Sequence, residues 1–199
     1  MGWLKKGQST NPHIGSKDWW LYEFSVEEIE QMRSAFTPMG NIPLEAMLEA
    51  PDPSALATLA GHFKKKNLRH LGYRVLDRAD FLVGKNVSPV SLHFYFQARG
   101  DFYYRWRDED ADALEQAVES FKRQIGLAES VEKDLMIDFG DERRLPGHAG
   151  YRQLRIIEEK RGNLTLAKAL CLQAKKEGWA DDWDKHIRRL DKKIAAITA

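Results

Sequence analysis

At 199 residues, with 43% hydrophobic and 31% charged residues, the chain has the composition of a soluble helical protein with one sizeable core. Its 31 basic and 30 acidic residues leave a net charge of +1, which argues against nucleic acid or a membrane surface as the primary partner. Because it has a single cysteine, no signal-peptide core and no apolar run near the ~20 residues of a membrane span, we expect a cytoplasmic protein without disulfides or spanning helices.

The first part of the chain predicts a tail followed by a helical cap. Residues 1–18 are rich in Gly, Ser, Asn and Lys, and we expect them to be a flexible tail. Residues 19–50 should form N-terminal capping helices that open with Trp19 and Trp20. Two interpretations of this Trp pair stay open: a cap over the end of a helical stack, which we favour, or a docking surface for another protein or a second copy.

Two local signals mark helix starts. Ser25, with Glu28 three residues later, predicts a capping box, and Asp52 followed by Pro53 is the favoured order of cap and first helical residue. The second start opens the first of three expected helical hairpins, residues 53–84. Its expected buried positions recur at helical steps on both sides of a turn at Asn67, and are Leu56, Leu59, Ala60, Phe63, Gly72, Leu76 and Ala79.

The second expected hairpin, residues 90–128, is less regular. Residues 108–112 lengthen its joint by about one helical turn. Helical spacing places Phe96, Tyr103 and Trp106 toward the core, with the neighbouring arginines outside. After this hairpin we expect an irregular linker over residues 136–148.

The third expected hairpin, residues 147–179, carries the clearest pattern. Gly162 and Asn163 predict a tight turn, because glycine accepts the positive φ that ends a helix. The second helix has a buried stripe of Ala167, Leu170, Cys171 and Ala174, so Cys171 is expected to be a small core residue rather than a nucleophile. Residues 181–197 predict a last amphipathic helix that caps the stack.

The third hairpin resembles the tetratricopeptide repeat. Six places of that motif are occupied, by Tyr151, Leu154, Gly162, Ala167, Cys171 and Ala174. Arg155, Glu158 and Cys171 stand where the family usually has a small residue, a tyrosine and an aromatic. The first hairpin repeats the spacing, since Leu59 precedes its turn residue by the same interval as Leu154 does.

The resemblance implies an all-α fold: a right-handed superhelical stack of about three hairpins within a single domain, residues 19–199, capped at both ends. It also implies a protein-interaction scaffold, without enzymatic activity, cofactor or metal, whose first helices line a groove for a protein or peptide partner. The groove-facing places fall on Lys64, Lys65, Gln97, Asp101, Tyr104, Arg105, Arg152, Ile156 and Glu159. Mixed charges with one aromatic favour a polar peptide anchored at Tyr104. Family members that grip a terminal carboxylate use a Lys and an Asn, and this chain lacks the Asn.

Two alternatives stay open beside the scaffold. Lys64 to Lys66 and the interleaved arginines and aromatics of residues 99–107 could bind single-stranded nucleic acid, although near-zero net charge disfavours this. An enzyme with a site between helices is the other alternative. The sequence has no zinc-ligand spacing, no nucleophile elbow and no glycine-rich phosphate loop to support it.

Overall fold

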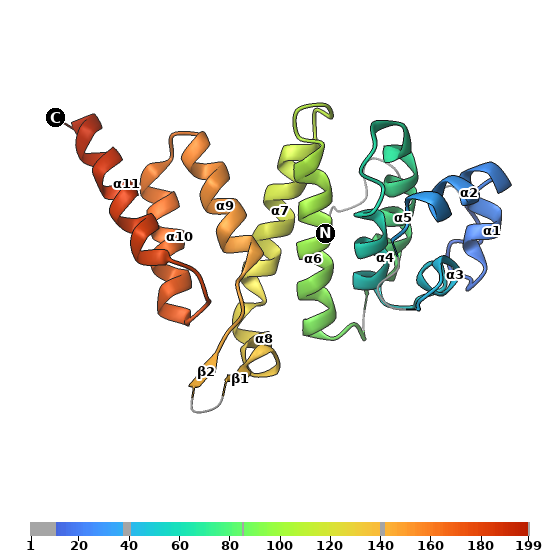
Figure 1. The fold of residues 1–199 in the computed structure, drawn as a ribbon, viewed down its shortest axis with the longest axis horizontal. Helices are drawn as coiled ribbons and strands as arrows, with labels where there is room; N and C mark the ends of the chain where they lie inside the picture. Colours follow the sequence, from blue (N-terminus) through green and yellow to red (C-terminus); the bar gives the residue numbers. More distant parts are fainter. Residues whose placement is uncertain (1–10, 38–40, 85, 140–141, 199) are drawn as a thin grey trace. The chain divides into compact units, whose positions relative to one another are not determined.

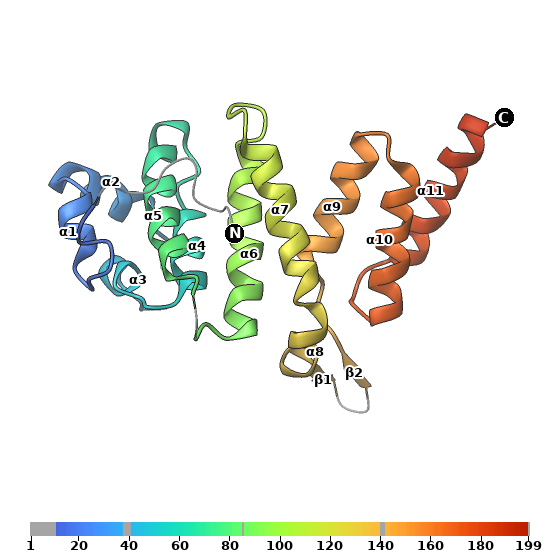
Figure 2. The same ribbon diagram turned by 180° about the vertical axis from the view of Figure 1, so that it is seen from behind.

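The computed structural model describes residues 11–37, 41–84, 86–139 and 142–198. Over these residues the chain is predominantly helical, with α1 to α11, one short 3₁₀ helix η1 and one two-stranded ladder (Figure 1; Figure 2). The predicted all-α class is therefore confirmed, whereas the right-handed repeat stacking stays a prediction. The chain divides into two compact units, unit 1 up to Phe102 and unit 2 from Tyr103. The single domain expected over residues 19–199 stays a prediction.

Two helices of unit 1 begin at the residues that the sequence predicted. The Ser25 hydroxyl accepts from the Glu28 backbone N–H at 3.2 Å, and the Glu28 carboxylate accepts from the Ser25 N–H at 2.9 Å, which completes the capping box. Asp52 accepts from the Ser54 N–H at 2.8 Å, with Pro53 as the first helical residue. The helices of unit 1 are α1 (Trp19–Glu23), α2 (Val26–Ala35), α3 (Leu44–Leu48), α4 (Pro53–Ala60), η1 (Lys66–Leu68), α5 (Arg69–Leu82) and most of α6 (Pro89–Arg105).

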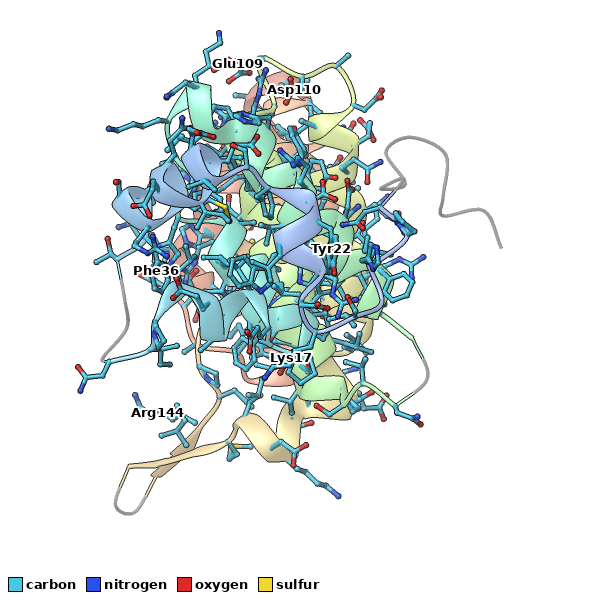
Figure 3. All side chains as sticks on the ribbon, turned by 90° about the vertical axis from the view of Figure 1, so that its right-hand side faces the viewer. Lys17, Tyr22, Phe36, Glu109, Asp110 and Arg144 are labelled. Atoms are coloured by element: carbon cyan, nitrogen blue, oxygen red, sulfur yellow. The ribbon has the colours of Figure 1, made fainter. Side chains whose placement is uncertain are left out.

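The predicted tail is only partly described, and the described part is bonded to α1. Residues 1–10 lie outside the described residues, while residues 11–18 form successive turns. The Asn11 amide donates to the Trp19 carbonyl at 3.2 Å. The His13 ring stacks on the ring of the exposed Tyr22, which Figure 3 labels, and the two ring centroids are 3.8 Å apart. Trp19 is fully buried, and its indole N–H donates to the Leu48 carbonyl at 2.8 Å. The Trp pair is therefore part of the core of unit 1.

The core of unit 1 includes one close contact between α5 and α6. Gly72 lies against Phe102, and a Cβ added at this glycine would come within 2.4 Å of the Phe102 ring. Tyr73 packs edge-on to the same ring at 5.1 Å. Since any larger side chain at Gly72 would displace the ring, the glycine at this expected buried position has a packing reason.

Unit 2 contains three elements that were not predicted from the sequence, two strands and one helix. Residues 136–148 were expected to be an irregular linker, but β1 (Ile137–Phe139) pairs antiparallel with β2 (Glu142–Arg144). The helix α8 (Ala128–Leu135) precedes this ladder. Figure 3 shows Arg144 of β2 at one end of unit 2 and Glu109 and Asp110 at the other. The remaining helices of unit 2 are α7 (Ala113–Gly126), α9 (Ala149–Lys160), α10 (Leu164–Glu177) and α11 (Trp183–Thr198).

The α9–α10 hairpin follows its sequence pattern closely. Gly162 has a φ of 82°, and the Asn163 N–H donates to the Glu158 carbonyl at 2.8 Å, as in a glycine-ended helix. The predicted stripe of α10 is buried. Cys171 is fully buried, and burial raises the pKa of its thiol to about 11, so it acts as a core residue as expected. None of the helices in the described ranges is long and apolar enough to cross a membrane.

Candidate functional site

The first two predicted groove residues, Lys64 and Lys65, do not lie on a first helix. The helix α4 ends at Ala60, because the chain leaves helical geometry after Gly61 and draws Phe63 into the core. Both lysines are exposed in the connection that follows. Their expected place on a first helix is therefore wrong, whereas their part in a groove stays a prediction. Lys65 instead lines an open hollow of about 310 Å³ together with Glu30, Gln31, Ser34, Ala35, Asn67 and Leu68.

The next two, Gln97 and Asp101, are half-buried on the part of α6 that belongs to unit 1. Between them, Arg99 is 5% exposed and its Nε lies 3.3 Å from Asp80 Oδ1. The expectation that the arginines of this stretch lie outside is wrong for Arg99, because the half-buried Asp80 supplies its ionic partner. Phe96 and Trp106 are buried as predicted, and Tyr103 is half-buried.

Within unit 2, Tyr104 is held against the end of α9. The Lys160 ammonium donates to the Tyr104 hydroxyl at 3.4 Å and lies 6.0 Å from the ring centroid. The Arg107 guanidinium lies 4.4 Å from the same centroid, and donates to the Tyr104 carbonyl at 2.7 Å. The ring is half-buried and flanked by two cations, and Arg105 follows it at the end of α6.

Arg152, Ile156 and Glu159 share one stripe of α9, as predicted from their spacing of four and three residues. The Arg152 Nε donates to Asp181 at 3.2 Å, and Ile156 is half-buried. Glu159 is only 12% exposed, and is the centre of an ion-pair network. Since it already has several partners, it organises this face rather than offering a free carboxylate.

The network around Glu159 extends from α9 to α11. Arg189 donates to both carboxylate oxygens, one of them at 2.6 Å, and Lys193 donates at 2.7 Å. The buried Arg155 approaches the same carboxylate at 3.4 Å through Nη1. The hydrogen bond from Arg189 is the main reason why the pKa of Glu159 falls to about 2.

The face that α9 and α11 form carries more positive than negative charge. Its ion pairs join four cations to two carboxylates, and their members are Arg152, Arg155, Arg189, Lys193, Glu159 and Asp181. Arg152, Arg189 and Lys193 keep 49%, 41% and 51% of their side-chain surface exposed. Solvent-facing N–H donors therefore remain available on this face after the internal pairing.

Sequence reasoning missed Arg189 and Lys193, because residues 181–197 were treated only as a cap. Their signal was present in the spacing. The two residues are four apart and lie off the apolar stripe that includes Trp183 and Leu190, both of which are buried. What the sequence did not contain was the identity of their partner on α9.

Unit 1 has an acidic cluster of a different character. Burial, with Asp80 and Glu23 nearby, raises the pKa of Asp77 to about 7, although Arg99 acts in the opposite direction. Asp80 also accepts a hydrogen bond from the Tyr95 hydroxyl. In the part of the chain that the structure describes, no group of three or more His, Cys, Asp or Glu is arranged to hold a metal ion.

Comparisons with protein-family models, with curated proteins and with solved structures find no match to this chain. The resemblance to the tetratricopeptide repeat therefore rests on the sequence pattern alone.

Proposed function

We propose that this protein is an interaction module that binds an acidic polypeptide segment in unit 2, on the face of α9 and α11 together with the end of α6. Tyr104, which contacts Lys160 of α9 from the end of α6, serves as its aromatic anchor. The observation that carries the proposal is the surplus of half-exposed cations around a carboxylate that is already fully engaged. Arginine donors on a rigid helical face suit the carboxylates of Asp and Glu side chains.

The internal network has a second role in this proposal, which is to hold the cations in place. Glu159 fixes Arg189 and Lys193 on α11, and Asp181 fixes Arg152 on α9. Side chains that are already ordered lose less conformational entropy when a ligand binds. A segment carrying two or three acidic residues would bridge these cations without displacing Glu159.

The test is selection of binding segments from a random peptide display library, followed by titration of a labelled acidic hit. We expect Tyr104→Ala combined with Arg105→Glu to weaken binding at least about tenfold, because it removes an anchor and reverses a charge. Helix content by circular dichroism should be unchanged. Binding should also weaken as salt is raised from about 50 to about 500 mM.

Matched controls lie on exposed positions of other helices of unit 2. Lys122→Glu on α7 makes the same charge reversal, and Leu172→Ala on α10 removes an exposed apolar side chain. Both should leave the peptide affinity within about twofold of the original. Selection of only basic or apolar peptides, or equal loss of affinity in the controls, would contradict the proposal.

Nucleic-acid binding remains the second hypothesis, and one part of its basis is weakened. Lys64 to Lys66 are exposed, but Arg99 is buried against Asp80 and Trp106 is buried as well. Single-stranded oligonucleotides that show no retardation at low salt would remove this hypothesis. Cytoplasmic location and self-association stay predictions from the sequence.

A further inference from the structure

Arg78 of α5 is a buried guanidinium in unit 1 that pairs with no carboxylate of the described residues. Its residue is only 5% exposed. Among the residues that the structure describes, no acceptor reaches its Nε or its Nη1. A charged group removed from water without acceptors is costly, and native structures seldom keep one without a reason.

Two other arginines of unit 1, Arg74 and Arg99, have carboxylate partners. Arg74, one turn earlier on α5, bonds to Glu23 at 2.7 Å and to Glu28 at 2.6 Å. Arg99 on α6 pairs with Asp80. Glu23, Glu28 and Asp80 are therefore paired with arginines other than Arg78, and burial alone lowers the pKa of Arg78.

Two aromatic rings supply the favourable contacts of the Arg78 charge. The guanidinium carbon lies 5.9 Å from the Trp19 ring centroid and 5.5 Å from that of Phe81. Contacts of this kind return less free energy than the desolvation of an unpaired guanidinium costs. They also leave Nε and Nη1 without an acceptor in the part of the chain that the structure describes.

The two rings differ in their exposure to solvent. Trp19 is fully buried, whereas Phe81 is 56% exposed. Gly15 lies near the edge of the Phe81 ring, so the turns of residues 11–18 border the same place. Phe81 is therefore the solvent-facing aromatic neighbour of Arg78, and Trp19 is the buried one.

We propose that Arg78 is the centre of an anion site, which binds the carboxylate or phosphate group of a small ligand beneath Phe81. The oxyanion supplies an acceptor for one of the two N–H groups, at Nε or at Nη1, that lack one, and the guanidinium supplies the matching positive charge. Trp19 is the buried aromatic neighbour of this site and Phe81 the exposed one. This site lies in unit 1 and is independent of the peptide-binding face proposed for unit 2.

The experiment compares the melting temperature of the full chain in sodium phosphate, sodium acetate and sodium chloride at equal ionic strength. For a Kd of about 1 mM, about 50 mM of the preferred anion raises the melting temperature by about 5 °C over chloride. Arg78→Met should abolish this anion-specific increase. A general salting effect of phosphate would act on both proteins alike, so the difference between them is the readout.

The stability in chloride alone gives an independent check. Replacing the unpaired guanidinium by a methionine of similar length should leave the melting temperature unchanged or higher. Arg74→Met is the matched control: it breaks two ion pairs, should lower the melting temperature, and should keep the response to the anion. Should Arg78→Met fail to fold, Arg78→Lys keeps the charge and is expected to bind the anion about tenfold more weakly.

The two anions also identify the class of ligand. A larger response to phosphate indicates a phosphorylated ligand, and a larger response to acetate indicates a carboxylate. Equal responses of the original protein and Arg78→Met to both anions would overturn the site.

Discussion

The α4–α5 hairpin of unit 1 and the α9–α10 hairpin of unit 2 have the same spacing of apolar residues but different helices. In both, the predicted apolar positions are buried, as Leu59 and Leu154 show. Yet α4 ends at Ala60 after 8 residues, whereas α9 continues to Lys160. The α9–α10 turn needs only a few residues around Gly162, while a 3₁₀ helix lies between α4 and α5.

The difference shows that the burial of apolar side chains and the length of a helix have separate causes. A stripe of apolar side chains determines which face of a segment is buried. The end of the helix depends on local competition, and Gly61 weakens α4 well before the basic run that follows. In unit 2 the first weak helix former after the stripe is Gly162, which is also the residue that closes the turn.

The two hairpins also shift the pKa of a partly buried carboxyl group in opposite directions. Glu159 in unit 2 is surrounded by cations, and its pKa is lowered to about 2. Asp77 in unit 1 lies in a partly buried acidic neighbourhood, and its pKa is raised to about 7. The stability of the two regions should therefore respond to pH with opposite sign.

The largest expected effect tests the close packing in unit 1. Gly72→Ala would place a methyl group 2.4 Å from the Phe102 ring, so the ring or the helix must move. We expect a loss of about 2–3 kcal/mol in the free energy of unfolding, measured by urea denaturation. Gly126→Ala, whose Cβ would meet nothing within 4 Å, is the control and should be neutral or stabilising. Equal stability of Gly72→Ala and the original protein would show that α5 and α6 are not closely packed.

The next effect concerns the network of unit 2. Glu159→Gln removes the charge that Arg189 and Lys193 share, and should cost about 1.5 kcal/mol at pH 7. The folded pKa is below the unfolded one, so this stabilisation is present above pH 4.5 and is lost as the pH falls toward 2. Urea denaturation at about pH 7 and about pH 3 should show the difference between the two proteins shrinking. A difference that does not depend on pH would argue against an ionic origin.

The opposite pH response is expected in unit 1. The folded pKa of Asp77 is raised, so its contribution to stability is present below pH 3.8 and is lost as the pH rises through about 7. Asp77→Asn, which stays neutral, should be more stable than the original protein at about pH 8 by about 1 kcal/mol, after allowance for partial solvent contact. Thermal melts between about pH 4 and about pH 8 measure this. A variant that is less stable at the alkaline end would mean that the ionised carboxylate has a partner.

The smallest effect tests the turn of unit 2. Gly162→Ala forces an alanine into a φ of 82°, where its Cβ meets nothing within 4 Å, so the cost comes from backbone strain alone. We expect a loss of about 0.5–1 kcal/mol in urea denaturation. Gly162→Asn should lose less, because asparagine tolerates this conformation better. Equal costs for the two variants would mean that the strain does not originate in φ.

Much of the secondary structure was readable in the sequence because its signals are local. Ser25 with Glu28, Asp52 with Pro53, and Gly162 each act within one helical turn of themselves. The two short strands had a local signal as well, since Gly140 and Asp141 are a residue pair typical of two-residue hairpin loops. The irregular composition around them led to the prediction of a linker instead.

The candidate site was predictable only in part. The spacing of Arg152, Ile156 and Glu159 on one stripe follows from the period of a helix. Lys64 and Lys65 do not lie on a helix because α4 ends at Ala60. This end depends on Gly61 and on the burial of Phe63 in the core. That second condition is set by residues distant in the sequence.

The sequence by itself determined which apolar side chains are buried in the α4–α5 and α9–α10 hairpins, as Leu59, Ala79, Leu154 and Ala174 show. It could do so because the hydrophobic effect acts on a periodic pattern that neighbouring residues define. Only the tertiary structure decided which charges meet: Glu159 with Arg189, Arg99 with Asp80, and Arg78 with no carboxylate of the described residues. Pairing depends on the distance between side chains of different helices, and only the packing of those helices fixes that distance.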